Sequence, residues 1–332
     1  MSADVPTDDV LANQVELLWQ RSINPNTAHA YRVGLKHLQT FLALRKVPLT
    51  PGVLPPVSED TLGLFVSYCH QNLKLNHNTI KLYLAGIRFH YLKAGHTNPL
   101  ADTPRLHYIL RGIQKSQANT TTAKRLPITF SILQQMSDRL LRGMFSPYTD
   151  ILLQAMCTMA FFGFLRCGEF TAQNLDDTDV ILLHDIAFAS DNQSYILTLR
   201  SSKTDPFRHG VPIQIFSNTS LCPVKAMTAF LGWRNSLGTS PTSPLFIDHN
   251  RSVITRNQFL GYIKHTLSVV GLDQAKYSGH SFRIGAGTTA AEKGVEDHLI
   301  QTLGRWSSNC YTRYIHTSSN MIQRAQCTMS SK

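Results

Sequence analysis

The chain has 332 residues, is 42% hydrophobic and 16% charged, and carries a formal net charge of +11. This composition excludes an intrinsically disordered chain, and the length predicts two domains. No membrane-spanning helix is predicted, because no apolar run reaches about 18 residues. The excess of basic residues favours an anionic partner, nucleic acid ahead of a membrane surface, although such charge can also serve solubility alone.

Apolar residues three or four positions apart predict helices in the first 115 residues. These helices are expected to begin near Asn26, Ser58, Asn78 and Pro104. Asn78 is the expected N-cap of the third helix, which continues to Gly95, because an asparagine side chain accepts hydrogen bonds from N–H groups of the first turn. No strand is needed, so residues 1–115 are predicted to form an all-helical domain. The polar, threonine-rich residues 116–127 are predicted to be a linker.

Residues 128–332 are predicted to combine helices with a small sheet. Helices are expected from about Phe130, from Ser146, from Pro223 and onward from Thr255. Strand-like runs separated by turn residues predict a small antiparallel sheet over residues 185–215, and the segment PLFI at 244–247 is an expected short strand. The predicted fold class is therefore mainly α with a small antiparallel β-sheet, an all-helical domain being followed by an α+β domain with a C-terminal tail.

The cysteines and the first residues indicate the compartment. The six cysteines form no CxxC pair and no regular framework, which is typical of reduced thiols in an intracellular protein and argues against a zinc site. The first ten residues are acidic and polar, unlike a signal peptide. We therefore expect no metal and no membrane association, and a protein that stays in the cytoplasm or enters the nucleus.

Four separated stretches carry residues suited to phosphate chemistry. They are GFLRCGE with Arg166 and Glu169, RSSKTD with Lys203, GHSFRIG with His280 and Arg283, and GRWSSNCYTRYI with Arg305, Trp306 and Tyr314. Each alone has a plain structural interpretation. An arginine can end a helix, a lysine in a turn is usually solvated, a His-x-x-Arg pair occupies one helix face by chance, and neighbouring tyrosines usually pack. Together they are far more specific.

In this order and at these separations the stretches resemble the catalytic domain of the tyrosine recombinase family, the phage-integrase-like site-specific recombinases. The resemblance implies that Tyr314, nine residues after Arg305, is the nucleophile. It also implies that Lys203 is the β-hairpin lysine and that the helical domain is the family's DNA-binding, core-binding domain. The stretches HSFRIGAGTTAA and LGRWSSNCYTRYI are most similar to recombinases of eukaryotic mobile elements of the Crypton or DIRS type, which implies a nuclear enzyme of DNA integration or excision.

These residue types suit a phosphodiester transesterification. Attack by a phenolate adds negative charge to the phosphoryl oxygens, and the guanidinium groups of Arg166 and Arg283 can clamp them with paired hydrogen bonds. A free tyrosine has a pKa of about 10, so His280 would accept or share its proton, while Lys203 would protonate the departing 5′ oxygen. A 3′-phosphotyrosyl intermediate conserves the bond energy, so no cofactor, metal or ATP is expected.

The sequence departs from the family pattern at two positions. Arg305 stands where the family usually has His or Trp, with Trp306 immediately after it, and either side chain could face the phosphate. Ile284 replaces a second histidine. Glu169 is expected to anchor neighbouring helices rather than carry a proton.

The departures keep other functions open. One alternative is a domesticated DNA-binding protein that no longer cuts, and another is a type IB topoisomerase. The expected partner is double-stranded DNA, with a tetramer on two duplexes implied by the resemblance. Lys81 and Arg88 are candidate DNA contacts of the helical domain, and a solvated helix face explains them equally well.

Overall fold

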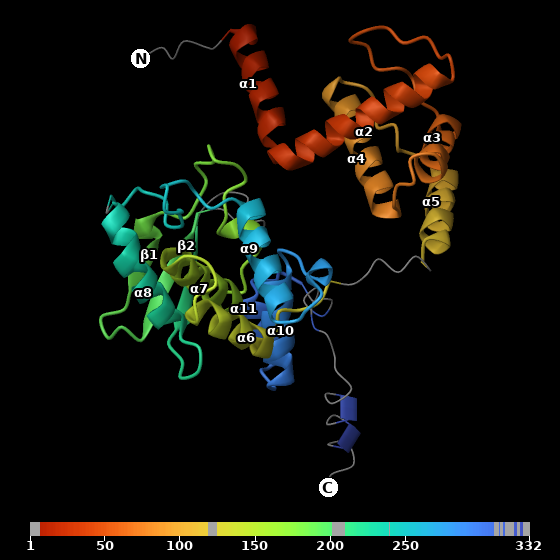
Figure 1. Cartoon of the computed structure of the whole chain (residues 1–332). Helices are drawn as coiled ribbons and strands as arrows, with labels where there is room; N and C mark the ends of the chain where they lie inside the picture. Colours follow the sequence, from red (N-terminus) through yellow and green to blue (C-terminus); the bar gives the residue numbers. More distant parts are fainter. Residues whose placement is uncertain are drawn as a thin grey trace. The chain divides into compact units, whose positions relative to one another are not determined.

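The computed structural model describes residues 7–118, 125–200, 210–238 and 240–308, together with 312, 315, 322–323 and 326–327. The chain divides into two compact units, Met1–Thr122 and Ala123–Lys332 (Figure 1). The described part of the first unit is helical, and that of the second combines helices with one antiparallel sheet, so the predicted fold class is confirmed. No helix in the described ranges is long and apolar enough to cross a membrane.

Five helices make up the described part of the first unit. They are α1 (Asp8–Arg21), α2 (Pro25–Leu44), α3 (Glu59–Gln71), α4 (His77–Lys93) and α5 (Pro104–Ser116). Ser58 caps α3 as expected, but the expected cap of α4 was wrong. Asn76 caps this helix through a 2.9 Å hydrogen bond from the Thr79 N–H to its Oδ1 atom. Asn78 already lies inside the first turn, so its side chain cannot cover that turn's N–H groups.

Helix α1 was not predicted from the sequence, because it buries none of its residues and so lacks the contact that makes an apolar stripe recognisable. Its C-terminal half is attached to α4 by an edge-on ring contact between Trp19 and Phe89 at 5.3 Å and by a salt bridge between Glu16 and Lys93. Solvent screens an exposed ion pair of this kind, so the ring contact is the main attachment.

Two glycines allow helices α2 and α4 to cross closely. A Cβ atom on Gly34 would lie 2.7 Å from the Cα atom of Tyr83, and one on Gly86 would lie 2.6 Å from the Cα atom of Tyr31. Because each glycine faces the backbone of the other helix, no side-chain rotation could make room. The core of this unit, which includes Leu38, Phe65 and Ile87, closes around that crossing.

The described residues of the second unit combine a small sheet with helices and four short 3₁₀ segments. The helices are α6 (Phe130–Leu141), α7 (Pro147–Phe162), α8 (Pro223–Arg234), α9 (Arg256–Val269), α10 (Ser281–Glu292) and α11 (Asp297–Leu303); the short segments used below are η1 (Cys167–Glu169) and η2 (Leu183–Asp185). The strands are β1 (Ile186–Phe188), β2 (Ser194–Leu199) and β3 (Val211–Phe216), paired antiparallel in that order. The PLFI segment forms only isolated bridges, including Pro244 with Leu182, so the prediction of a strand there was wrong.

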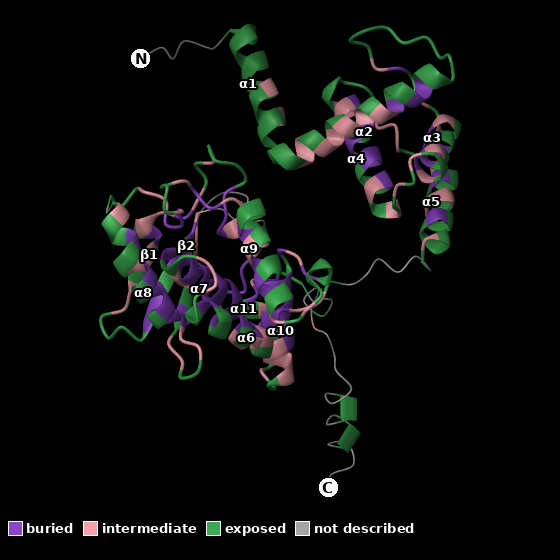
Figure 2. Ribbon diagram, in the orientation of Figure 1, coloured by how far each residue is buried: buried purple, intermediate pink, exposed green. Residues whose placement is uncertain are grey.

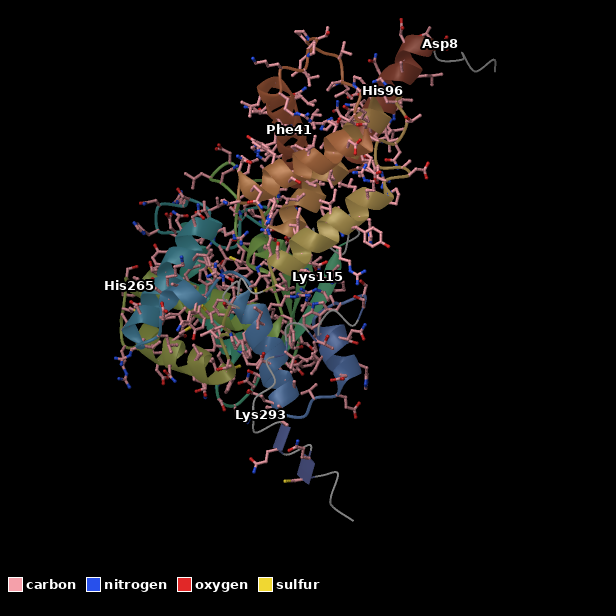
Figure 3. All side chains as sticks on the ribbon, turned by 90° about the vertical axis from the view of Figure 1, so that its right-hand side faces the viewer. Asp8, Phe41, His96, Lys115, His265 and Lys293 are labelled. Carbon is pink, nitrogen blue, oxygen red and sulfur yellow. The ribbon has the colours of Figure 1, made fainter. Side chains whose placement is uncertain are left out.

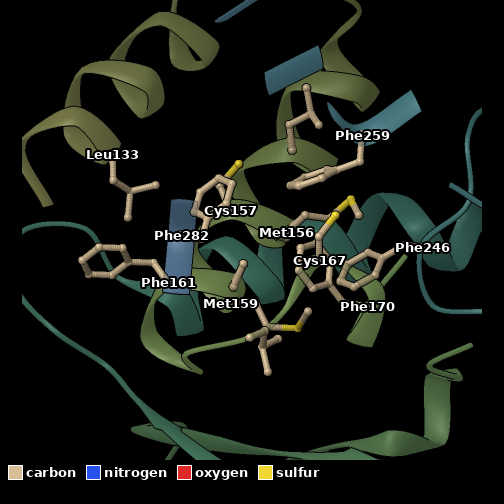
Figure 4. Close-up of a cluster of buried hydrophobic side chains, with 14 of the residues drawn as sticks. Leu133, Met156, Cys157, Met159, Phe161, Cys167, Phe170, Phe246, Phe259 and Phe282 are labelled. Carbon is tan, nitrogen blue, oxygen red and sulfur yellow. The ribbon is translucent and has the colours of Figure 1, made fainter. Parts of the chain in front are cut away.

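Helix α7 is the centre of the core. It is apolar on almost every face, and Figure 2 shows buried residues concentrated along it. Side chains from the turn after α7 meet those of α9 and α10 in Figure 4, where Phe259 contacts Phe170 at 5.1 Å and Phe282 at 6.0 Å between ring centroids. This packing fixes the turn after α7 against the start of α10. Figure 3 shows charged side chains outside this core, such as Lys293 at the end of α10.

Residues 125–128 enter the second unit as an extended segment on α10. The Leu126 N–H donates to the Lys276 carbonyl at 2.8 Å, and the Ile128 N–H donates to the Ser281 carbonyl at 2.9 Å. A Cβ atom on Gly285 would lie 1.7 Å from the Ile128 carbonyl oxygen, so only glycine fits there. Residues 125–127, which the sequence analysis assigned to the linker, therefore contribute to the fold of this unit.

We predict that Gly86→Ala destabilises the first unit by about 1–3 kcal/mol, because the new methyl group must push α2 and α4 apart. Gly112→Ala in α5 is the matched control. No atom lies within 4 Å of its new Cβ, so it should be neutral or stabilise by up to about 1 kcal/mol through helix propensity. Urea unfolding of the whole chain measures both changes, and equal effects of the two substitutions would contradict the close crossing.

Candidate active site

The turn after α7 carries the first candidate residues. Helix α7 ends at Phe162, Gly163 is its C-cap, and Phe164 adopts the left-handed conformation with φ of 50°. The backbone therefore leaves the helix before Arg166, which is extended and immediately precedes η1. The stretch GFLRCGE therefore lies beyond the end of the α-helix and not on it. A consequence is that the carbonyl groups of residues 163 and 164 accept hydrogen bonds from arginine side chains.

Glu169 is the acceptor at the other end of this turn. Its carboxylate accepts from the Arg166 backbone N–H at 2.9 Å and from Arg166 Nη1 at 2.7 Å. The Glu169 side chain is 5% exposed and that of Arg166 is 19% exposed. A carboxylate buried to this degree needs a charged hydrogen-bond donor, and Arg166 supplies one from the same turn. Arg166 is thereby held with part of its guanidinium group at the surface.

Arg305 lies on the inner side of the same turn. Its Nη1 atom donates to the Gly163 carbonyl at 2.8 Å, and its Nη2 atom donates to Glu169 Oε2 at 3.1 Å and to the Phe164 carbonyl at 3.4 Å. Burial lowers the pKa of Arg305 below its usual value, and the Glu169 carboxylate opposes that effect. An arginine nevertheless stays protonated at neutral pH. The sequence left open whether Arg305 or Trp306 faces a phosphate, and here both side chains are directed into the fold.

Arg283 is fully buried in the first turns of α10. Its Nη1 atom donates to the Phe164 carbonyl at 2.5 Å, its Nη2 atom donates to the Gly304 carbonyl, and its guanidinium carbon lies 4.5 Å from the centre of the Trp306 ring. Cation–π contact and carbonyl acceptors together stabilise the charge of Arg283. Arg283 and Arg305 thus share the Phe164 carbonyl as an acceptor.

Trp306 completes the buried side of the cluster. It is 7% exposed and packs edge-on against Phe164 with ring centroids 6.1 Å apart. The ring also covers Gly304, since a Cβ atom there would lie 1.8 Å from Trp306 Cζ3. The only side chain that position 304 can carry beneath this ring is therefore a hydrogen atom.

His280 lies next to this cluster, three residues before Arg283. It is the exposed N-cap residue of α10, so it stands at the start of the helix that carries Arg283. Its segment is attached to the turn through the Cys167 N–H, which donates to the Gly279 carbonyl at 3.3 Å. Burial raises the pKa of the Cys167 thiol, so this cysteine is a packing residue and not a nucleophile.

Four candidates from the sequence remain. Lys203 and Tyr314 are outside the described residues. Lys81 and Arg88 are exposed on α4 in the first unit. The structure therefore brings Arg166, Glu169, Arg283, Arg305 and Trp306 together on one turn and places the His280 segment beside it. Sequence reasoning missed the acceptors of residues 163 and 164, because they are backbone groups with no side-chain signature; the glycine before Phe164 was the available hint of a helix end.

The three guanidinium groups and one carboxylate give the described cluster an excess positive charge. Such a cluster can stabilise charge that develops on phosphoryl oxygens. Comparison with known proteins agrees with this chemistry. Residues 134–321 match the sequence profile of the phage integrase family. A Selenomonas ruminantium protein described as an integrase/recombinase XerD homolog is 23% identical over 280 residues, which are 81% of this chain and 73% of that protein.

Solved structures show the same fold. The XerH site-specific recombinase bound to its palindromic difH substrate matches with a TM-score of 0.66 and 14% identity, over 91% of this chain and 80% of that one. The Tn1549 transposon integrase in complex with transposon right end DNA matches with a TM-score of 0.62 and 14% identity, over 96% and 98% of the two chains. At these identities the similarity concerns the fold.

We predict that Gly304→Ala displaces the Trp306 ring and destabilises the second unit by about 1–3 kcal/mol, because the added methyl group overlaps that ring. Thermal unfolding should show a lower midpoint, and the tryptophan emission should shift to longer wavelength. Gly232→Ala in α8 is the control, since nothing lies within 4 Å of its new Cβ. An unchanged emission spectrum in Gly304→Ala would contradict the packing described.

Proposed function

The chain belongs to the phage integrase (tyrosine recombinase) family, and on this premise we propose that it is a site-specific DNA recombinase that cleaves and rejoins duplex DNA through a 3′-phosphotyrosyl intermediate. The observation that carries the proposal is the convergence of three arginines from separate segments on the turn at residues 163–169. Structural neighbours that are recombinases bound to DNA support a DNA partner.

The reaction we propose begins with attack of the Tyr314 oxygen on a backbone phosphorus. A phosphorus–oxygen bond to Tyr314 forms and the bond to the 5′ oxygen breaks, while His280 accepts or shares the tyrosine proton and Lys203 supplies a proton to the 5′ oxygen. The reverse sequence on a second 5′ end rejoins the strand. Because each bond made replaces a bond broken, the exchange needs no external energy source.

Arg166 and Arg283 are the proposed clamp on the phosphoryl oxygens. Arg166 is already partly exposed and has donors on Nη2 and Nε that no described group occupies. Arg283 is different, because the carbonyls of Phe164 and Gly304 accept from its two terminal nitrogens. We therefore propose that the scissile phosphate replaces at least one of these carbonyls as the acceptor, a favourable exchange because a charged acceptor forms the stronger hydrogen bond.

The biological context we propose is a eukaryotic mobile element of the Crypton or DIRS type, with action in the nucleus. The stretches HSFRIGAGTTAA and LGRWSSNCYTRYI, including the unusual Arg305, support it. Short repeats flanking the gene in its genome are the corresponding check, and a single-copy gene without them would speak for a host protein.

A catalytically silent DNA-binding protein is the second candidate. It is favoured by the full burial of Arg283 and by Ile284, which is also buried and cannot act on a phosphate. Its DNA binding would weaken steeply with salt, as counterion release requires, without any covalent product. The following experiment separates the two candidates.

We predict that the protein forms a covalent adduct with nicked duplex DNA. The bound sequence is first selected from a pool with a randomised central segment, and duplexes of that sequence are nicked at successive positions so that the cleaved fragment dissociates. Wild-type protein should give a slower band on a denaturing gel, and Tyr314→Phe should give none because it lacks the attacking oxygen, with unchanged DNA affinity.

Tyr311→Phe is the matched control and should still form the adduct, because this neighbouring tyrosine is expected to pack. Adduct formation by Tyr314→Phe, or tight binding by wild type without any adduct at every nick position, contradicts the proposed mechanism. The second of these results would favour the silent DNA-binding protein.

We further propose that the active assembly is a tetramer on two duplexes, in which residues 317–332 contact a neighbouring copy. Light scattering of the protein with the selected duplex should give the mass of four chains and two duplexes, and truncation after residue 316 should lower it. A mass of one chain per duplex at micromolar concentration would count against the assembly.

A further inference from the structure

We propose that Arg305 is a positioning residue whose guanidinium group holds Glu169 and the carbonyls of residues 163 and 164, so that Arg166 is presented to the scissile phosphate, and that Arg305 does not contact this phosphate. The inference rests on the proposed function. It concerns the position at which this chain departs from the family pattern, where the sequence left the role of the side chain open.

The first support is the direction of the side chain. Arg305 is 11% exposed, and its two terminal nitrogens are used by three acceptors of the turn after α7. Its Nε atom is buried and has no hydrogen-bond partner within the described residues. A phosphate contact through Nη2 would require giving up the charged Glu169 carboxylate, whereas Arg283 would exchange only a neutral carbonyl and Arg166 has open donors where it stands.

The second support is the backbone at Arg305, which holds the side chain in this direction. Arg305 has φ of 53° and follows the C-cap of α11. Its N–H donates to the Thr302 carbonyl at 2.9 Å, and the Trp306 N–H donates to the Gln301 carbonyl at 3.0 Å, which is the Schellman pattern of a helix end. A left-handed arginine is strained unless its surroundings hold it, and the turn at residues 163–169 supplies the bonds that do so.

The third support is charge. Glu169 is nearly buried and lies between the guanidinium groups of Arg166 and Arg305, accepting from both. With both cations present, the charge of the Glu169 carboxylate is balanced. Arg166 then donates to this carboxylate from only one terminal nitrogen of its guanidinium group. Without Arg305, the full carboxylate charge would draw the remaining donors of Arg166 inward, because a buried carboxylate recruits whatever cation can reach it. Arg305 therefore acts on the reaction through Glu169 and Arg166.

A double-mutant cycle between Arg305 and Glu169 tests this role. Arg305→Met, Glu169→Gln and the double variant are compared on the selected nicked duplex, measuring the rate constant of adduct formation at saturating protein and, separately, the dissociation constant of the duplex. Arg305→Met should slow the reaction about 100-fold, as expected for a misplaced catalytic group, while duplex affinity changes less than about threefold. The double variant should react within about threefold of the slower single variant, since both changes interrupt the same path.

Arg305→Lys keeps one charge but loses the fork of donors, so its rate should lie between those of wild type and Arg305→Met; if the Met variant does not fold, Lys takes its place in the cycle. Arg142→Met removes an exposed arginine of the same unit and should leave the rate unchanged. If the rate constant of the double variant falls by the product of the two single reductions, Arg305 acts independently of Glu169, through its own contact with the phosphate. That result overturns the proposal while the recombinase function stands. Absence of any wild-type adduct overturns both.

Discussion

The candidate site depends on one electrostatic constraint, which is that three guanidinium groups can share one turn only if acceptors lie between them. Glu169 and the carbonyls of residues 163 and 164 provide these acceptors. Without them, the mutual repulsion and desolvation of buried cations would cost several kcal/mol per ion. The break of α7 at Phe162 is therefore necessary for this arrangement, because a continuous helix would use the same carbonyls in its own hydrogen bonds.

Close backbone contacts bring the segments that carry the arginines to this turn. A glycine makes each contact possible. Gly285 of α10 lies against the backbone of Ile128, Gly279 lies against Cys167 beside η1, and Gly304 lies beneath the Trp306 ring. A side chain at any of them would move the neighbouring segment by a fraction of an ångström or more. Distances of that size decide whether a guanidinium group meets a carboxylate, so packing in the core and geometry at the site are coupled.

The three arginines of the cluster differ in how far they are exposed and in which groups surround them. Arg166 is partly exposed, Arg283 is enclosed between carbonyls and an indole ring, and Arg305 lies between Glu169 and the backbone. A substrate phosphate could meet Arg166 without rearrangement, but Arg283 only by replacing an acceptor. The positive charge of the cluster is therefore compensated by acceptors within the protein.

The sequence by itself determined the residue types, their order and the fold class. Helical periodicity located α2, α3, α4 and α5 because it reflects local geometry, and the spacing from Arg166 to Tyr314 identified the family because chemistry fixes which side chains must be present. Only the tertiary structure decided where each side chain points. The inward direction of Arg305 and the acceptors at residues 163 and 164 depend on two left-handed residues, Phe164 and Arg305, and on hydrogen bonds between segments over a hundred residues apart. Local sequence carries no record of such contacts.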